Sequence, residues 1–378
     1  MINEVIKKII KYPLTLMVGL FLIVMLFVYI CKKDAVVSEV ENRSLAMRPE
    51  ISLDGLADGS FMSSFEDYTE DQLPLRDAFI RVKAFCEIIL LKTENNGIAK
   101  GKDGFLFEKN YELSGQLHKN ISAIGNFVKD INRDVYIAIA PTSTRVYEEK
   151  IPYGLPVLDE EKASIELNNA LSKYENAQVI NLYDAIVENP ADDRDELYYR
   201  TDHHWTTKGA YKAYCEIAGR MNFVPVDFET LTKNQVDNFY GTFYSKYKGI
   251  GIKPDTITYV DVDIESYLAD SDEHSSLMDL DKINAYDKYA MFMYGNPGKG
   301  LIKTSCHNGK KLIVLKDSYA NSLLPFMACS YENIVVLDLR YFGGSVQETL
   351  QENMDADVLL MYNWSFMNED NHFYKLIK

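Results

Sequence analysis

The polar residues best spaced for chemistry lie at 201–211, where the sequence reads TDHHWTTKGAY. Either threonine of the pair 206–207 is a natural N-cap for the helical pattern that follows, so Asp202 to His204 form a non-helical approach to a helix. In extended backbone, residues i and i+2 point the same way, which predicts Asp202 and His204 on one face and His203 on the other. A carboxylate that orients an imidazole through its Nδ1–H is the acid and base half of a nucleophilic triad.

A serine that suits this pair follows the apolar run at 312–315, in the string KDSYANS at 316–322. Where a buried strand turns into a helix, a serine lies at the carboxyl edge of the sheet, and the helix N-terminus supplies N–H groups for an oxyanion. We therefore predict Ser318 as the nucleophile, His204 as its base and Asp202 as the acid that orients the imidazole.

Simpler interpretations of the same residues remain open. Asp202 could cap the following helix, and Ser318 could be an N-cap and nothing more. A metal site made of Asp202, His203 and His204 is a further alternative, but no second histidine pair with a carboxylate supports it. The five cysteines lack the C-x-x-C spacing of zinc ribbons. We therefore expect neither a metal nor a cofactor.

Other polar residues that follow strands or form turns are predicted to have lesser roles. Ser143 and Thr144 follow another apolar run and are expected to line a cleft. The segments 240–242 and 295–298 have the composition of ordinary turns, although Asn296 in the second is a candidate oxyanion donor.

Five short apolar runs, rich in β-branched residues, are typical of strands buried on both faces of a sheet. Helical patterns separate most of them, and this alternation predicts a doubly wound, parallel α/β sheet with helices on both faces. Right-handed crossovers would bring Ser318 and the segment 201–205 to the same edge of that sheet. The predicted strands are 135–140, 179–182, 312–315, 334–337 and 358–361, and the predicted helices are 121–131, 162–174, 207–221, 319–327 and 345–352.

The N-terminal part of the chain contains an uncharged apolar run at 13–31, which at about 1.5 Å per residue spans about 30 Å of bilayer hydrocarbon. The residues that end the run are not small, so an uncleaved anchor is favoured over a signal peptide or a lipoprotein acylated at Cys31. The numbers of Lys and Arg before and after the run differ only slightly, so this charge difference alone does not set the orientation of the helix.

The domain organisation that we expect has three parts. Residues 1–33 would form a cytoplasmic tip and a transmembrane anchor, and 34–100 an acidic stalk with an amphipathic helix at 76–91 whose apolar side chains face inward. Residues 101–378 would form the α/β domain, beginning with a short strand at 105–107 and interrupted by an insertion at about 223–300.

The composition excludes some classes of protein. With 40 Lys and Arg against 56 Asp and Glu, the net charge is −16, and no basic face is available for nucleic acid. A hydrophobic fraction of 47% argues against a disordered chain.

The string TDHHWTTKGAY resembles the signature of the DHHW family, found in anchored proteins of Gram-positive bacteria. Nearly the whole chain takes part in the resemblance, which extends to the motifs at 41–43, 58–61, 71–77, 101–104, 316–322 and 338–341. That family is similar to the SGNH-like proteins of alginate O-acetylation, which carry a D-x-H pair before the serine. The resemblance implies an SGNH-hydrolase-like three-layer α/β fold and gives Asp202, His204 and Ser318 the triad roles.

The activity implied by the resemblance is O-acetylation of an exported or cell-wall polysaccharide outside the cell. The partners would be that polysaccharide, an integral-membrane acyltransferase that supplies acetyl groups, and the membrane through residues 13–31. A carbohydrate acetylesterase with the same triad, or a catalytically silent protein that binds glycan or assists assembly, is the alternative.

The sequence departs from ordinary SGNH esterases next to the serine, where Lys-Asp-Ser at 316–318 replaces Gly-Asp-Ser. The candidates for the oxyanion and for substrate contacts are the Tyr319 backbone N–H, Asn296, Arg340, His203 and Trp205.

Overall fold

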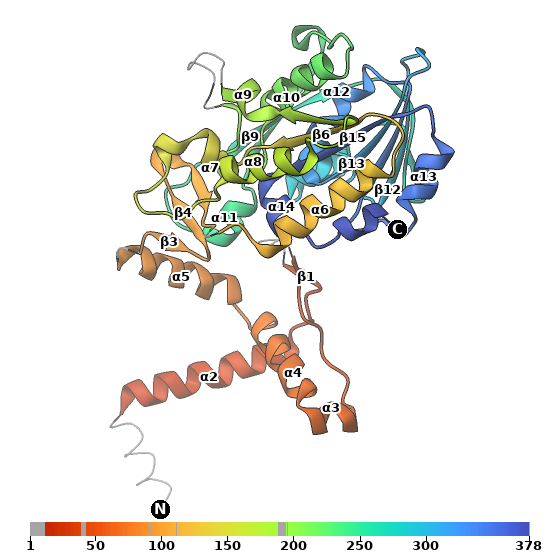
Figure 1. The fold of residues 1–378 in the computed structure, drawn as a ribbon. Coiled ribbons are helices and arrows are strands. Elements are labelled where there is room, and N and C mark those ends of the chain that lie inside the picture. Colours follow the sequence, from red (N-terminus) through yellow and green to blue (C-terminus); the bar gives the residue numbers. More distant parts are fainter. Residues whose placement is uncertain are drawn as a thin grey trace, which may run out of the picture. The chain divides into compact units, whose positions relative to one another are not determined.

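A computed structural model describes residues 12–38, 43–90, 92–110, 112–187, 194 and 196–377. The chain divides into two compact units, Met1–Leu91 and Lys92–Lys378 (Figure 1). In the described part of the first unit, β1 (Val37–Ser38) pairs antiparallel with β2 (Arg43–Ser44). The helices formed by the described residues of this unit are α2 (Pro13–Cys31), α3 (Leu53–Asp58), α4 (Ser60–Asp71) and α5 (Arg76–Ile89).

The predicted apolar segment forms a single continuous helix, α2. Among the described residues, it is the one helix that is long and apolar enough to cross a membrane, and its side chains are not buried. The sequence analysis is thus confirmed to the extent that the chain carries an N-terminal apolar helix suited to a membrane anchor or a signal sequence.

The amphipathic helix predicted at 76–91 is α5, but its apolar side chains do not face inward. Phe79 and Phe85 are 42% and 48% exposed, whereas the small Ala84 is buried. None of the large buried apolar clusters among the described residues includes a residue of the first unit. Among the described residues of its own unit, the helix therefore has no large apolar cluster against which these side chains could pack.

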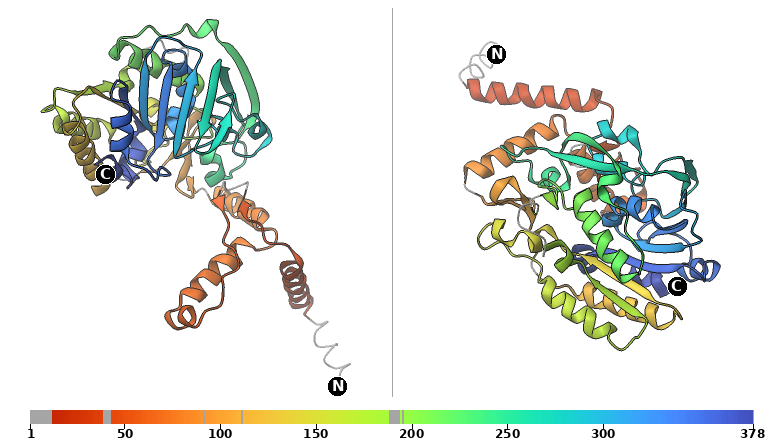
Figure 2. Two further views of the ribbon diagram at one scale, coloured as in Figure 1. Left: turned by 90° about the vertical axis from the view of Figure 1, so that its right-hand side faces the viewer. Right: turned by 90° about the horizontal axis from the view of Figure 1, so that it is seen from above.

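The second unit is built on a large sheet (Figure 2), with strands in the order β11-β10-β12-β14-β13-β15-β6-β7 among the described residues. The five strands from β14 to β7 are mutually parallel and correspond to the five predicted apolar runs, which confirms the parallel sheet. They are β6 (Val135–Ala140), β7 (Ala177–Asn181), β13 (Lys311–Lys316), β14 (Asn333–Asp338) and β15 (Asp357–Asn363).

Three further strands, which the sequence analysis did not predict, make the sheet mixed. They are β10 (Ile264–Ala269), β11 (Asp272–His274) and β12 (Lys299–Thr304), and they pair antiparallel. Side chains along β12 alternate between buried and more exposed positions. A strand with this alternation lacks the continuous apolar run by which strands buried on both faces are recognised.

Side chains from the parallel strands point alternately into two apolar cores, one on each face of the sheet. Ile137 and Ile313 belong to the core beneath α6, α8, α13 and α14, whereas Ala138 and Val314 belong to the core beneath α9, α10 and α12. Helices therefore cover both faces, and the predicted three-layer α/β fold is confirmed. These helices are α6 (Gly115–Lys129), α8 (Glu160–Leu171), α9 (Leu182–Val187), α10 (Thr207–Arg220), α12 (Leu324–Ala328), α13 (Val346–Glu352) and α14 (Trp364–Glu369).

The turn after β13 differs from the predicted helix at 319–327. The Asp317 carboxylate accepts hydrogen bonds from the N–H groups of Tyr319 (2.8 Å) and Asn363 (2.7 Å). The chain then forms a 3₁₀ helix, η7 (Ser318–Ser322), before α12 begins. The single helix was the wrong prediction because the Asp317 cap closes a tight turn and Pro325, which has no N–H, favours a new helix start.

Smaller elements surround the carboxyl edge of the parallel strands. The strand predicted at 105–107 is β5, displaced by one residue, and the region 223–300 supplies the β8–β9 hairpin and α11 as well as β10 and β11. The remaining strands and α-helices are β3 (Glu94–Asn95), β4 (Ile98–Lys100), β5 (Leu106–Glu108), β8 (Thr232–Phe239), β9 (Asp255–Asp261), α7 (Ser143–Val146) and α11 (Thr242–Tyr247). The other 3₁₀ helices are η1 (Lys102–Gly104), η2 (Glu148–Lys150), η4 (Phe228–Thr230), η5 (Leu280–Asn284), η6 (Lys288–Met291) and η8 (Phe373–Ile377).

Candidate active site

The structure brings Asp202, His204 and Ser318 into one hydrogen-bonded chain. His204 Nδ1 lies 2.5 Å from Asp202 Oδ2, and His204 Nε2 lies 2.7 Å from Ser318 Oγ. Ser318 follows the central strand β13, so the segment 201–205 and the serine meet at the carboxyl edge of the parallel strands, as predicted. All three side chains are buried, and the distances allow a proton to move between serine and imidazole.

Asp202 is held by a turn 40 residues later in the chain. Its Oδ1 accepts hydrogen bonds from the backbone N–H of Thr242 (2.7 Å) and from the Thr242 hydroxyl (2.6 Å). A Cβ at Gly241 would lie 2.2 Å from the Asp202 Cβ, so only glycine fits beside this carboxylate. The sequence analysis assigned 240–242 to an ordinary turn, and no local pattern could have linked it to Asp202.

His203 contradicts the prediction that it points away from Asp202 and His204. Its ring centroid lies 3.7 Å from that of His204, and its Nδ1 lies 3.5 Å from Asp202 Oδ1 and 2.6 Å from Thr242 Oγ1. The alternation of extended backbone does not apply, because the chain bends at each residue from 201 to 204. Asp255 holds this bend by accepting a hydrogen bond from the N–H of Thr201 at 2.8 Å.

Trp205 connects the histidine segment to the serine turn from a buried position. Its indole N–H donates to the Tyr319 carbonyl oxygen and to Ser322 Oγ, both at 3.0 Å. The helix α10 then begins as predicted, since the Thr206 side chain accepts a hydrogen bond from the N–H of Gly209. Trp205 is fully buried and therefore acts on the relative position of the two segments rather than on a substrate.

Tyr289, which the sequence analysis did not single out, packs directly against the imidazole of His204. The two rings are 3.7 Å apart and inclined by 7°, and the Tyr289 hydroxyl donates to the Ser318 carbonyl oxygen and to Ser322 Oγ, both at 3.2 Å. This residue of η6 thus contacts both the imidazole and the turn that carries the serine. The surplus of Tyr in the sequence gave no signal that would distinguish it.

Two of the predicted oxyanion donors are already engaged in hydrogen bonds. The Tyr319 N–H donates to Asp317, as described above. The side-chain oxygen of Asn296, Oδ1, accepts hydrogen bonds from Lys316 Nζ (3.3 Å) and from Asn321 Nδ2 (3.1 Å). Since these bonds hold its Oδ1, the donor that remains on the Asn296 side chain is its NH₂ group.

Arg340, the third candidate, is fixed by Asp338. Its Nε and Nη2 donate to the two carboxylate oxygens at 2.8 and 2.6 Å. Lys316, whose side chain is fully buried, lies 3.5 Å from the same carboxylate. Burial lowers the pKa of Lys316 to about 8 although Asp338 raises it.

The electrostatics of the triad favour a neutral base beside a charged acid. Burial raises the pKa of Asp202, but the imidazoles of His204 and His203 lower it well below its ordinary value. For His204, burial and the neighbouring His203 lower the pKa to about 4, outweighing the effect of Asp202. His204 is therefore neutral near pH 7. With its Nδ1–H directed at Asp202, its Nε2 can accept the serine proton.

The metal interpretation fits this arrangement less well. Asp202, His203 and His204 do offer ligand atoms within 4.8 Å of one another. However, both ring nitrogens of His204 and both oxygens of Asp202 already face hydrogen-bonding partners. An ion would have to displace the contacts that order the site.

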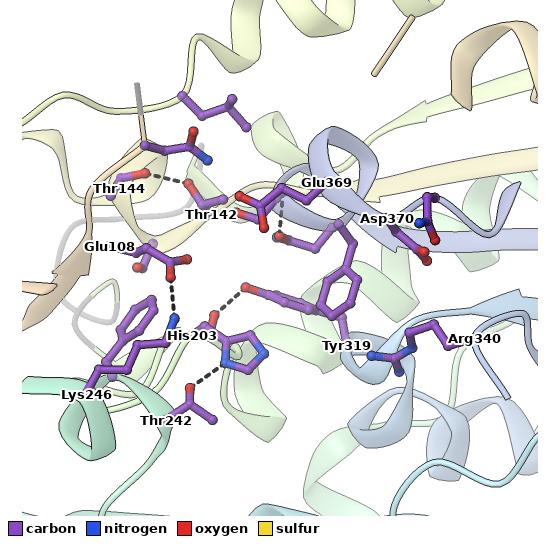
Figure 3. Close-up of a pocket in the computed structure, with 18 of the residues that line it drawn as sticks. Glu108, Thr142, Thr144, His203, Thr242, Lys246, Tyr319, Arg340, Glu369 and Asp370 are labelled. Carbon is purple, nitrogen blue, oxygen red and sulfur yellow. Dashed lines mark hydrogen bonds and ion pairs between the residues drawn. The ribbon is translucent and has the colours of Figure 1, made fainter. Parts of the chain in front are cut away.

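A cavity of about 520 Å³ is lined by His203 and Tyr319, among other residues (Figure 3). His203 and Tyr319 line it and also pack against His204, while Ser318 and His204 do not reach its lining. Ser143 and Thr144 line it as expected. This volume is in the range of small-molecule sites, so the cavity can hold a substrate group against His203 and Tyr319.

The comparisons with known proteins agree with this fold. The family model described as DHHW protein matches residues 119–337. A DHHW family protein from Eubacterium siraeum DSM 15702 is 25% identical with a TM-score of 0.62, covering 75% of this chain and 96% of that one. No curated protein matches the chain.

Bacillus cereus PatB1 shares the fold at 22% identity and a TM-score of 0.60, covering 73% of this chain and 98% of that one. Its structure with a sulfonyl adduct gives the same identity and TM-score, covering 74% of this chain and 97% of that one. The family match spans more than half of the chain, from α6 to β14, and includes the segments that carry Asp202, His204 and Ser318. The chain therefore belongs to the DHHW family.

Proposed function

We propose that this protein is an SGNH-like O-acetyltransferase that acetylates an exported or cell-wall polysaccharide through an acetyl-enzyme on Ser318. The observation that carries the proposal is the hydrogen-bonded series from Asp202 to His204 to Ser318 beside a cavity large enough for a substrate. A purely structural role would not require a neutral buried imidazole that faces a serine hydroxyl.

In the first half-reaction, His204 Nε2 accepts the proton of Ser318 Oγ while this oxygen attacks the carbonyl carbon of the acetyl donor. The bond from the acetyl group to the donor breaks, and the departing group takes the proton from His204. In the second half-reaction, a sugar hydroxyl gives its proton to His204 and attacks the acetyl-serine. The ester forms on the sugar, and the proton returns to Ser318. Asp202 stabilises the imidazolium that exists during both steps.

The tetrahedral intermediates need donors for the oxyanion. The Asn296 NH₂ group and the Arg340 guanidinium are the side-chain candidates that we retain, since the Tyr319 N–H already donates to Asp317. Tyr289, stacked on His204, would keep the imidazole in the plane required by both Asp202 and Ser318.

The proposed location follows from the apolar helix and from the substrate. Residues 13–31 would anchor the protein in the cell membrane, with the α/β unit outside the cell, where a wall or exported polysaccharide is found. The acetyl donor would come from an integral-membrane acyltransferase.

A covalent-labelling experiment tests the nucleophile. The full-length chain in detergent is incubated with p-nitrophenyl acetate, and separately with an aryl sulfonyl fluoride, a reagent suggested by the sulfonyl adduct in PatB1. We expect a burst of nitrophenol and both modifications on Ser318. Ser318→Ala should lose both, whereas Ser172→Ala, which removes an exposed serine after α8, should keep them.

The result that would contradict the proposal is modification of another residue, or a normal burst in Ser318→Ala. The products then separate two enzymes with the same triad. Acetylated sugar supports a transferase, whereas free acetate as the sole product in the presence of glycan supports an acetylesterase.

A further inference from the structure

The cavity beside the triad contains a second carboxylate and imidazole pair, formed by Asp370 and His372 directly after α14. The two residues have the same spacing as Asp202 and His204 and make the same local contacts. His372 Nδ1 lies 2.5 Å from Asp370 Oδ1, and the His372 N–H donates to the same oxygen at 2.9 Å. Both residues line the cavity.

The surrounding chain fixes the position of this pair. The Asp370 N–H donates to the Phe366 carbonyl oxygen at 2.9 Å, and Asn120 Nδ2 donates to the Asp370 carbonyl oxygen at 2.7 Å. The Asp370 side chain is only 6% exposed, but that of His372 is 35% exposed. The carboxylate is thus sheltered, and the imidazole that it orients remains accessible.

The hydrogen bonds determine what His372 can offer to a ligand. In the neutral imidazole, Nδ1 carries the proton that faces Asp370, so Nε2 holds a lone pair and accepts hydrogen bonds. Across the described residues, Nε2 has no protein partner, unlike His204 Nε2, which faces Ser318. Without a hydroxyl or thiol beside it, this pair is not a second nucleophilic site. It is an ordered hydrogen-bond acceptor in a cavity.

The neighbouring wall complements this acceptor. Arg340 holds Asp338 through Nε and Nη2, which leaves Nη1 outside that pair, and its guanidinium lies 4.8 Å from the ring centroid of Phe366. Arg340 and Phe366 both line the cavity, and Figure 3 shows Arg340 and Asp370 on the same side of the view. An acceptor, a donor and an aromatic ring together match the hydroxyl groups and the C–H face of a sugar.

We propose that Asp370 and His372 form the acceptor-sugar subsite of this enzyme. His372 Nε2 accepts a hydrogen bond from a sugar hydroxyl other than the one that is acetylated, and thereby orients the glycan toward the acetyl-serine. The inference rests on the proposed transferase function and identifies the part of the site that selects a carbohydrate over water.

The experiment separates acetyl-enzyme formation from acetyl transfer. The full-length chain in detergent receives p-nitrophenyl acetate, with chitotetraose and cellotetraose as acceptor probes. The nitrophenol burst reports acylation of Ser318, and mass spectrometry gives the ratio of acetylated oligosaccharide to acetate. Isothermal titration calorimetry of each oligosaccharide measures binding independently of turnover.

For His372→Ala we expect an unchanged burst, but a transfer ratio and a binding affinity lowered about five- to tenfold, the effect of losing one hydrogen bond. His372→Gln, whose carbonyl oxygen also accepts hydrogen bonds, should recover part of both. His118→Ala is the matched control. It removes an exposed histidine that also pairs with a carboxylate, Glu166 at 3.1 Å, but does not line this cavity.

The proposed subsite would be overturned if His372→Ala kept the transfer ratio and the oligosaccharide affinity of the wild type, or if His118→Ala lowered both to the same extent. It would also be overturned if the wild-type chain formed acetyl-enzyme but neither bound nor acetylated the oligosaccharides. A wild-type chain without a burst instead refutes the proposed function. In that case the calorimetric comparison of wild type with His372→Ala still decides whether the pair binds sugar.

Discussion

Replacing Asp202 by Asn distinguishes a catalytic acid from a helix cap. Asp202 Oδ1 faces the Thr242 backbone N–H, which can only donate, and Oδ2 faces His204 Nδ1. The His204 backbone N–H also donates to Oδ2, but at 3.3 Å, so in Asp202→Asn the carboxamide oxygen takes the Oδ1 position, where the bonds from Thr242 are shorter. Its NH₂ group is then directed at the imidazole. His204 Nδ1 then becomes the acceptor, so the proton moves to Nε2, which faces Ser318.

This tautomer cannot take the serine proton, and the charge that stabilises the imidazolium is also lost. The same substitution in a serine protease triad lowers the rate by about 10⁴ while the geometry remains intact. Here the aspartate is fully buried. Burial raises its pKa, but the two imidazoles outweigh this effect and hold the pKa well below the ordinary value. We expect a loss of about 10⁴, and of at least about 10² if the coupling is weaker.

The assay is the nitrophenol burst with p-nitrophenyl acetate, with thermal unfolding and oligosaccharide binding measured on the same sample. We expect a folded variant that still binds the oligosaccharide but acylates very slowly. A capping role predicts the opposite, because Asn caps a helix about as well as Asp. Near-normal acylation in Asp202→Asn would therefore refute our assignment of the acid.

Four further predictions test the surroundings of the triad and the topology. Gly241→Ala should lower acylation about 10²-fold, because the added Cβ would displace Asp202. The control is Gly219→Ala in α10, where the added Cβ meets open space. This variant should keep full activity and gain up to about 1 kcal/mol of stability in thermal unfolding. His204→Ala should abolish acylation, whereas His203→Ala should act mainly on the shape of the cavity. If both variants lost acylation equally and chelators produced the same loss in the wild type, the site would hold a metal. NMR of labelled histidine, with the His204 signal assigned from the His204→Ala variant, should show His204 neutral from pH 7 down to about 5 and titrating near pH 4. Titration near pH 6.5 would contradict the effect of burial on this imidazole. Protease added to intact protoplasts should digest residues 34–378; protection would contradict the proposed extracellular location.

The parallel sheet, and the position of Ser318 directly after one of its strands, could be predicted from local pattern alone. Strands buried on both faces need continuous apolar runs, and those runs identified β13 and its four parallel neighbours. A D-x-H string before a helix and a serine after a buried strand pointed to Asp202, His204 and Ser318, and the family resemblance implied their triad roles.

Local pattern was misleading where the backbone is irregular. The alternation rule placed His203 away from its neighbours, but the chain bends at 201–204 because Asp255 binds the backbone at Thr201. The helix predicted after Ser318 is a 3₁₀ turn, since Asp317 closes it with a side-chain cap. In each case a side-chain hydrogen bond overrides the backbone preference on which the pattern relies.

The sequence by itself determined the fold class and the apolar N-terminal helix, because both depend on periodicity along the chain. It predicted the candidate triad from two short strings that lie 114 residues apart. Only the tertiary structure decided what surrounds them. It places Gly241 against Asp202 and stacks Tyr289 on His204. It also brings Asp370 and His372 to the cavity that His203 lines. These contacts join segments from different loops at one edge of the sheet. Their distances in sequence carry no periodic signal, so the folded path of the chain alone brings them together.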